Sequence, residues 1–192
     1  MEKDYENVKK LVENFKPTNN RQKEDKEVFL WCMDNMPDLL TTKNEQFHFT
    51  ATAFIVNTKR DKVLSIYRNT CDSWALPCGH ADNMKVMLNV ALKEAKEETS
   101  IKEFNVLNCG EPITIEKLLV DQHYKGNKLV YEHYHLNFTF ALEADDTLPL
   151  VINTTENSDI KWMEFDEFLE SVSEKNMDEV YKTMIKQIKK GL

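Results

Sequence analysis

Apolar and polar positions follow one another along the chain with two different periods, and the period changes near residue 46. Before that point, apolar residues recur among charged ones at helical spacing, which predicts helices over about 3–15 and 20–36. Pro17 and Pro37 follow these segments and would end them, because proline cannot continue a helix. We therefore expect residues 1–45 to form an N-terminal helical extension that packs on the main domain or on a partner.

From residue 46 to 192 the pattern is that of strands interleaved with helices. The expected strands, rich in β-branched and aromatic residues, are 48–56, 62–67, 113–123, 129–143 and 159–163. The expected helices are 84–99, 165–172 and 177–190. Because these elements alternate without the regular spacing of βαβ units, we expect an α/β fold with a mixed sheet covered by helices.

The long helix expected over 84–99 carries three carboxylates on one side. At about 100° per residue, Glu94, Glu97 and Glu98 fall within an arc of about 100°, away from the side that holds Lys85, Lys93 and Lys96. A solvated acidic face is the ordinary interpretation of such residues. Here the acids share their arc with apolar residues and lie near the helix C-terminus, where negative charge is disfavoured. A hard divalent cation would neutralise them, so the pattern indicates a metal site.

The spacing around these acids resembles the Nudix box, G-x5-E-x7-R-E-U-x-E-E-x-G-U, in which U is aliphatic. Gly79 takes the first glycine, Glu94 the acid after the arginine position, and Glu97 and Glu98 the final pair. Residues 74–80 resemble the W-x-x-P-G-G-H segment of many members, and residues 156–162 resemble their late E-x-x-x-x-x-W segment. The chain is thus similar to Nudix (MutT-like) hydrolases over about residues 47–172.

This resemblance implies an α/β/α sandwich and an enzyme that cleaves a diphosphate linkage in a nucleoside diphosphate derivative or a similar small molecule. It implies that Glu94, Glu97 and Glu98, with the main-chain carbonyl of Gly79, bind one or more Mg²⁺ (or Mn²⁺) ions. The same three glutamates are the implied catalytic residues. Either Glu97 or Glu156, on the late loop, would act as the base.

Three positions depart from the box. Lys85 and Lys93 replace a glutamate and an arginine that brace the loop in the family, and two lysines cannot pair. Asp82 is the expected N-cap of the long helix, and Lys85 in place of glutamate removes its capping box. Ser100 replaces the glycine that turns easily into the left-handed region at the helix end. We expect a looser junction between loop and helix, with every magnesium carboxylate still present.

Four histidines are candidates for substrate contact near the metal: His48, His80, His133 and His135. His133 and His135 lie two residues apart and share one face of their strand. A hydrogen-bonded structural role is the alternative for each of them.

Two further functions stay open beside hydrolysis. Cys78-Gly79-His80 resembles the reactive-cysteine segment of isopentenyl-diphosphate isomerases, which share the fold, and His48 resembles one of their metal-binding histidines. Their later E-x-E segment has no counterpart here, and an inert Cys78 is the alternative. The third function is a Nudix-fold nucleotide-binding or regulatory domain without turnover, which Lys85 and Lys93 favour and the complete set of box acids disfavours.

Charge and composition narrow the choice of partners. The formal net charge of −8 argues against binding a nucleic-acid polymer, which requires a basic surface. The N-terminus lacks the apolar segment of a signal peptide, and no run of residues is apolar enough to span a membrane. We therefore expect a cytoplasmic protein whose partner is a small diphosphate, and the resemblance to the Nudix family implies a nucleotide derivative. The helical extension could also form a homodimer.

Overall fold

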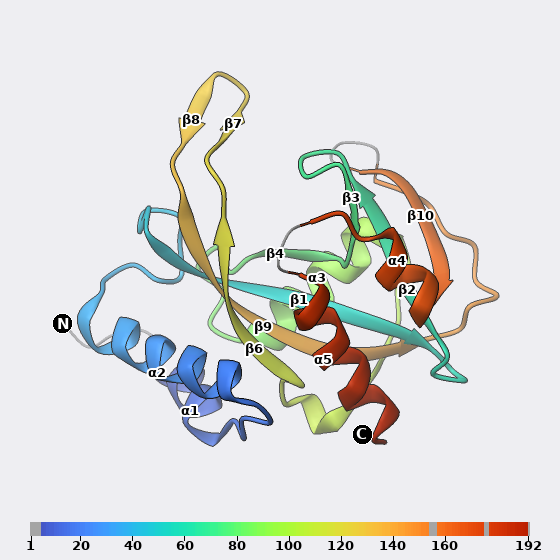
Figure 1. Ribbon diagram of the computed structural model, residues 1–192, viewed down its shortest axis with the longest axis horizontal. Coiled ribbons are helices and arrows are strands. Elements are labelled where there is room, and N and C mark those ends of the chain that lie inside the picture. The colour runs from blue at the N-terminus through green and yellow to red at the C-terminus, as the bar shows by residue number, and fades with distance from the viewer. Residues whose placement is uncertain (1–4, 154–156, 175–176, 192) are drawn as a thin grey trace.

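One large mixed sheet organises the fold (Figure 1). The computed structural model describes residues 5–153, 157–174 and 177–191. The central strand order is β10–β2–β1–β9–β5, and three further strands, β3, β4 and β6, pair with β2, β1 and β9. The strands of this sheet are β1 (Phe47–Asn57), β2 (Lys62–Arg68), β3 (Ser73–Ala75), β4 (Cys78–His80), β5 (Asn105–Val106), β6 (Thr114–Val120), β9 (His133–Ala144) and β10 (Asn157–Glu164).

Strands β1 and β9 form the parallel centre of the sheet. They pair in register from Phe47 with Tyr134 to Asn57 with Ala144, whereas the other pairings are antiparallel. Strands β7 (His123–Lys125) and β8 (Lys128–Val130) form a separate hairpin that projects from the sheet in Figure 1. The sheet is therefore mixed, as the sequence predicted.

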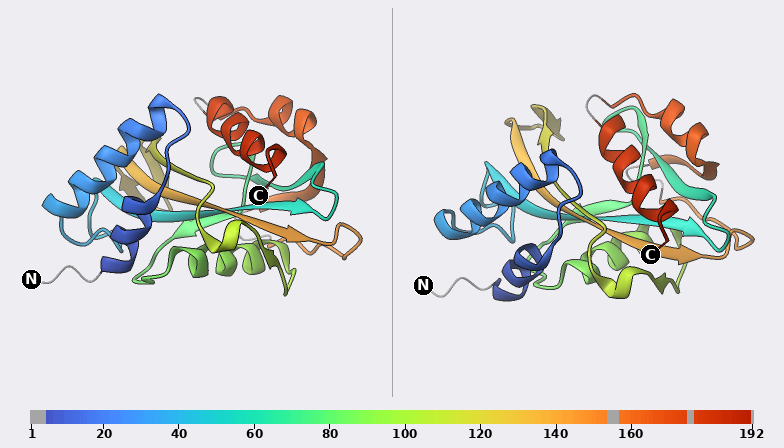
Figure 2. Two further views of the ribbon diagram at one scale, coloured as in Figure 1. Left: turned by 90° about the horizontal axis from the view of Figure 1, so that it is seen from below. Right: turned by 60° about the horizontal axis from the view of Figure 1, so that its bottom comes forward.

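Helices cover the two faces of the sheet. Along β1, Ala51 and Ala53 share a core with Val90 of α3 (Met87–Thr99). Phe54, on the opposite face, shares a second core with residues of α4 (Phe165–Ser171) and α5 (Asp178–Lys189), because successive strand residues point to opposite sides. Figure 2 shows the green helix α3 on one side and the orange-red helices α4 and α5 on the other. The predicted α/β/α sandwich is confirmed.

The N-terminal helices α1 (Glu6–Asn14) and α2 (Asn20–Asn35) pack against the edge of the sheet, where α2 contacts β6. Asn19 caps α2 by accepting a hydrogen bond from the backbone N–H of Gln22 at 2.8 Å. The Phe29 ring meets that of Phe138 on β9 edge to face, with centroids 5.2 Å apart. These helices therefore share a core with the sheet, and the division at residue 45 stays a prediction.

The loop before α3 differs from expectation. The helix begins at Met87, and its N-cap, Val86, offers no side-chain hydrogen bond. Asp82 has a φ of 46° and lies in a turn in which the N–H of Met84 donates to the carbonyl of Ala81 at 2.8 Å. The expected Asp82 cap was therefore wrong, because a tertiary turn precedes the helix. Ser100 does take the left-handed conformation at the helix end, with a φ of 60°.

Short strands account for the other differences. β3 and β4 lie within the segment expected to be a loop, and the strands expected over 113–123 and 129–143 are interrupted near residues 121 and 131 to form the projecting hairpin. Among the helices of the described ranges, none has both the length and the apolar character needed to cross a membrane.

Candidate active site

Glu98, the last acid of the box, is buried among hydrogen-bond donors from three strands. Its carboxylate accepts from Nη2 of Arg68 at 3.1 and 3.3 Å, from the N–H of Cys78 at 3.1 Å and from Nδ2 of Asn157 at 3.0 Å. Only 6% of the Glu98 side chain is exposed. Burial raises the pKa of this carboxyl, and the Arg68 charge opposes that effect.

Glu94 lies one helical turn before Glu98 and points at the backbone of β4. A Cβ atom added to Gly79 would overlap the Glu94 carboxylate. The glycine is therefore required here for the close approach of the acid, not for an unusual backbone conformation. The box thus brings its first glycine and its first key acid into contact across the loop.

Glu97 lies at the outer side of the group, with 54% of its side chain exposed. Lys93 connects it to Glu94, since its ammonium lies 2.8 Å from Oε1 of Glu94 and 3.3 Å from Oε2 of Glu97. The hydrogen bond to Glu94 raises the pKa of Lys93. The helical angles had placed Lys93 on the side away from the acids, but its long side chain reaches back to them.

Two residues at this group were not found from the sequence. Arg68 ends β2, and Asn157 begins β10; the two are register partners in the sheet, so both side chains reach Glu98. Nothing in the local sequence marks either one, because their approach depends on pairing between strands that lie far apart in the chain. Glu156, the rival base, lies outside the described residues.

The donor set suits a hard cation. Carboxylate oxygens from Glu94, Glu97 and Glu98 and a backbone carbonyl are the ligands that Mg²⁺ and Mn²⁺ take in proteins. The contact between Glu94 and Gly79 shows that one acid already lies against the loop that would supply the carbonyl. Arg68 and Lys93 hold positive charge at the same oxygens, so a metal would have to displace them from the carboxylates.

The four candidate histidines gather in one place. The ring of His48 lies 4.9 Å from that of His80, 5.0 Å from that of His133 and 4.9 Å from that of His135, centroid to centroid. The sequence had predicted one shared face for His133 and His135 only, and contact of the four histidines with a substrate near the metal stays a prediction.

Cys78 has the surroundings of an unreactive thiol. The pKa of this thiol is raised to about 11, chiefly by burial and also by the nearby charges of Glu98 and Glu94, against the opposing charge of Arg68. A thiolate is the reactive form of cysteine, so these surroundings disfavour the isomerase-like role. The backbone N–H of Cys78 donates a hydrogen bond to the carboxylate of Glu98.

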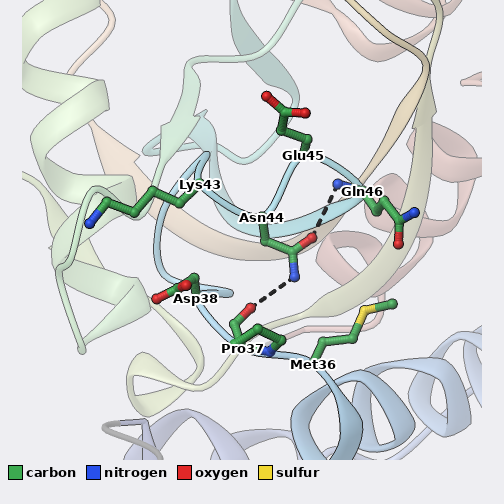
Figure 3. A pocket seen from close by; sticks show the side chains of 7 residues that line it. All are labelled: Met36, Pro37, Asp38, Lys43, Asn44, Glu45 and Gln46. Carbon is green, nitrogen blue, oxygen red and sulfur yellow. Dashed lines mark hydrogen bonds between the residues drawn. The ribbon is translucent and has the colours of Figure 1, made fainter.

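A depression of about 380 Å³ is lined by Met36–Asp38 and Lys43–Gln46, a set that includes none of the box acids (Figure 3). Asn44 shapes this loop by donating to the carbonyl of Pro37 at 2.8 Å and accepting from the N–H of Gln46 at 3.1 Å. The carbonyl oxygen of Asn44 also lies 3.1 Å from Nδ1 of His48, so the loop helps to position this histidine.

Comparison with known proteins defines the class of this fold and site. The family model of the NUDIX domain matches residues 46–187, more than half of the chain. The chain therefore belongs to the Nudix family. This confirms the resemblance found in the sequence and places the protein among hydrolases that act on diphosphate bonds.

Solved structures support the fold. An Ap4A hydrolase from C. elegans has a TM-score of 0.53 and 16% identity, over 71% of this chain and 93% of that chain. An E. coli dihydroneopterin triphosphate pyrophosphohydrolase has a TM-score of 0.53 and 16% identity, over 71% and 94%. The Nudix hydrolase RenU from M. smegmatis has a TM-score of 0.54 and 14% identity, over 76% and 88%. At these identities the likeness shows the fold alone. No curated protein sequence matches the chain.

Proposed function

We propose that this protein is a Mg²⁺-dependent (or Mn²⁺-dependent) pyrophosphohydrolase that cleaves the diphosphate linkage of a nucleoside diphosphate derivative or a similar small molecule. The family supports hydrolysis of diphosphate bonds. Two solved structures of the same fold bear the names of hydrolases of Ap4A and of dihydroneopterin triphosphate, which supports a nucleotide-like substrate. We expect the protein to act in the cytoplasm, and a homodimer through the N-terminal helices stays an expectation.

One observation carries the proposal: Glu98 is held buried beside β4 while Glu94 is pressed against Gly79 of the same strand. Two carboxylates converge on one short strand in an environment that penalises negative charge. Such a site favours a divalent ion that binds oxygen and, in turn, the oxygens of a diphosphate.

Each residue has a distinct proposed role. Glu94, Glu98 and the carbonyl of Gly79 would hold the metal, which when bound neutralises phosphate oxygens and lowers the pKa of water. Glu97, which is exposed and paired with Lys93, would take a proton from the attacking water or bind a further ion. Arg68 and Asn157 would orient Glu98. Lys93, once displaced from the acids, could attract the phosphates.

The experiment is an activity panel with Mg²⁺, in which chromatography follows cleavage of Ap4A, dihydroneopterin triphosphate and a nucleoside diphosphate sugar. We expect wild type to cleave at least one of them. Glu98→Gln should lower kcat by at least about 100-fold, since loss of charge stabilisation of about 3 kcal/mol corresponds to two factors of ten. The matched control is Glu103→Gln, which removes an exposed acid just beyond the helix and should leave kcat unchanged.

Other results would point elsewhere. Nucleotide binding without turnover would favour a regulatory domain, a possibility that the pairing of Arg68 and Lys93 with the acids supports, since these cations already neutralise the site. Isomerisation that depends on Cys78 would favour the isomerase. Turnover of equal rate in wild type and Glu98→Gln would contradict the proposed site.

A further inference from the structure

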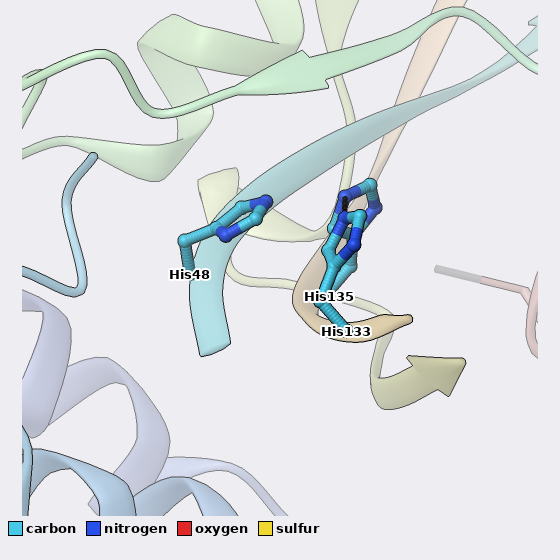
Figure 4. A group of neighbouring side chains, drawn as sticks. All are labelled: His48, His133 and His135. Atoms are coloured by element: carbon cyan, nitrogen blue, oxygen red, sulfur yellow. Dashed lines mark hydrogen bonds between the residues drawn. The ribbon is translucent and has the colours of Figure 1, made fainter. Parts of the chain in front are cut away.

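Three histidines from the two central strands converge on one point (Figure 4). His48 on β1 is the register partner of His135 on the parallel strand β9, and His133 lies two residues earlier on the same face. One potential ligand atom from each lies within 4.8 Å of the others. His80 on β4 adds a fourth ring, 4.9 Å from that of His48 and 5.1 Å from that of His135.

Backbone carbonyls fix the tautomers of two of these rings. Nδ1 of His48 lies 3.1 Å from the carbonyl oxygen of Asn44, and Nδ1 of His133 lies 2.8 Å from that of Tyr131. A carbonyl oxygen only accepts, so each Nδ1 must carry the hydrogen. In the neutral ring, Nε2 then presents a lone pair, which is the arrangement that histidine ligands of metals generally have.

The lone pair of His48 has no partner in the described part of the chain. His48 is only 3% exposed, and its Nε2 is buried without a hydrogen bond. Buried polar atoms are nearly always satisfied, so this nitrogen calls for a missing ligand. The lone pair of His48 Nε2 could donate to a metal ion held among these imidazole rings.

The spacing of the other two nitrogens suits a metal ion. Nε2 of His133 and Nε2 of His135 lie 3.3 Å apart. Two nitrogens at about 2.0–2.1 Å from a tetrahedral zinc ion would be about 3.3–3.4 Å apart. Because His133 presents its lone pair, His135 donates the hydrogen in this contact. On metal binding, His135 would adopt the tautomer with its hydrogen on Nδ1, and bonds from both Nε2 atoms to the ion would replace the hydrogen bond between them.

Burial disfavours the charged form of two of these rings, His48 and His135. The pKa of His48 is lowered to about 4, chiefly by burial and also by the nearby His80 and His133, against the backbone hydrogen bond to Asn44 and the charge of Asp82. Burial likewise places the pKa of His135 well below its ordinary value.

We propose that His48, His133 and His135 bind one divalent transition-metal ion of the zinc class, with His80 or a water molecule as the fourth ligand. Imidazole nitrogen selects such ions, whereas the carboxylates of the acidic group select Mg²⁺ or Mn²⁺. The two sites are separate: the Cβ direction of Gly79 meets Glu94, so the next residue, His80, faces the other side of the sheet. The protein would hold two metals of different chemistry.

The test is a titration of tag-free, metal-stripped protein with Co²⁺, followed by visible absorption, and then competition with Zn²⁺. We expect one equivalent of Co²⁺ to bind with the intense absorption of a four-coordinate site, and Zn²⁺ to displace it. His48→Gln, His133→Gln and His135→Gln should each weaken the affinity at least 100-fold. The matched control is His123→Gln, which removes the exposed histidine outside the three and should change it less than twofold.

Glu98→Gln provides the second control and separates this proposal from the hydrolase. It should keep full Co²⁺ affinity even though the hydrolytic site has lost a ligand. Far-ultraviolet circular dichroism in chelator would show that each histidine variant is folded. The proposal is overturned if wild type binds no Co²⁺, if the folded histidine variants bind it as wild type does, or if His123→Gln or Glu98→Gln abolishes the signal.

Discussion

Replacing Arg68 by glutamine tests how the buried charge of Glu98 is balanced. Arg68 gives Glu98 two hydrogen bonds, at 3.1 and 3.3 Å, and only 16% of the Arg68 side chain and 6% of the Glu98 side chain are exposed. Breaking a buried ion pair by removing one partner costs about 3–5 kcal/mol. We take the low end because Arg68 is partly hydrated. A loss of about 3 kcal/mol corresponds to a fall of about 6–12 °C in Tm for a chain of this size.

Magnesium should reverse much of this loss. In wild type the ion must displace Arg68 from Glu98, whereas in Arg68→Gln it would meet a carboxylate without that competitor. Mg²⁺ should therefore raise the Tm of the variant more than that of wild type, because an ion that binds the folded state stabilises it according to its affinity. Thermal melts in chelator and in millimolar Mg²⁺ measure both effects.

The matched control is Arg60→Gln, which breaks the Arg60–Glu143 pair at 3.0 Å, a partly buried ion pair distant from the box. Its loss of stability should be the same with and without Mg²⁺. A loss of less than about 1 kcal/mol in the free energy of unfolding of Arg68→Gln in chelator, well below the range for a buried ion pair, would contradict this prediction. The prediction is also wrong if Mg²⁺ shifts all three proteins equally.

Two further predictions concern the contact of Gly79 with Glu94 and the buried carboxyl of Glu116. Gly79→Ala should lower hydrolytic kcat at least tenfold and reduce the Mg²⁺-induced rise in Tm, because the new Cβ displaces the Glu94 carboxylate; unchanged values for both would contradict the close approach. Buried Glu116 accepts hydrogen bonds from Asn137 and Thr139, and burial raises its pKa to about 7. The folded state then binds more protons than the unfolded chain above pH 4.5, so this group makes stability fall as pH rises through 7. Between about pH 6.5 and 8 the fall should be about 0.8 kcal/mol. Chemical denaturation should show it in wild type and not in Glu116→Gln, and an equal slope in both would contradict it.

The acidic group was predictable in part because its information is local. Glu94, Glu97 and Glu98 lie on one helix, whose period alone places them on one side, and Gly79 precedes that helix at a fixed spacing. The structure shows that the three acids are not equivalent, since Glu98 is buried and Glu97 is exposed. That difference in exposure depends on where α3 packs against β4, which cannot be predicted from the angles of residues around the helix.

The balancing charges were not predictable from the sequence for a related reason. Arg68 reaches Glu98 only because the end of β2 pairs with the start of β10, which brings Arg68 and Asn157 together at this carboxylate. Lys93 was assigned to the outer side from its backbone angle, although its side chain is long enough to turn back to Glu94. The Asp82 cap was wrong because the backbone of Asn83 donates to the carbonyl of Leu40, a contact that holds the loop in a turn before the helix.

The histidine cluster was predictable from the sequence in part. The spacing of His133 and His135 predicted one shared face of a strand, and that much is local. The approach of His48 required the parallel pairing of β1 with β9, and that of His80 required β4 beside β1. The sequence therefore indicated the residues, while the three-dimensional register joined them.

Anomalous scattering from crystals grown with Mn²⁺ and a nonhydrolysable diphosphate would locate the metal ion directly. We predict a manganese peak in contact with the carboxylates of Glu94 and Glu98 and the carbonyl of Gly79, with Arg68 and Lys93 withdrawn from those oxygens. A map without manganese at these acids, in which Arg68 still binds Glu98 and Lys93 still binds Glu94 while the diphosphate lies elsewhere, would contradict the account.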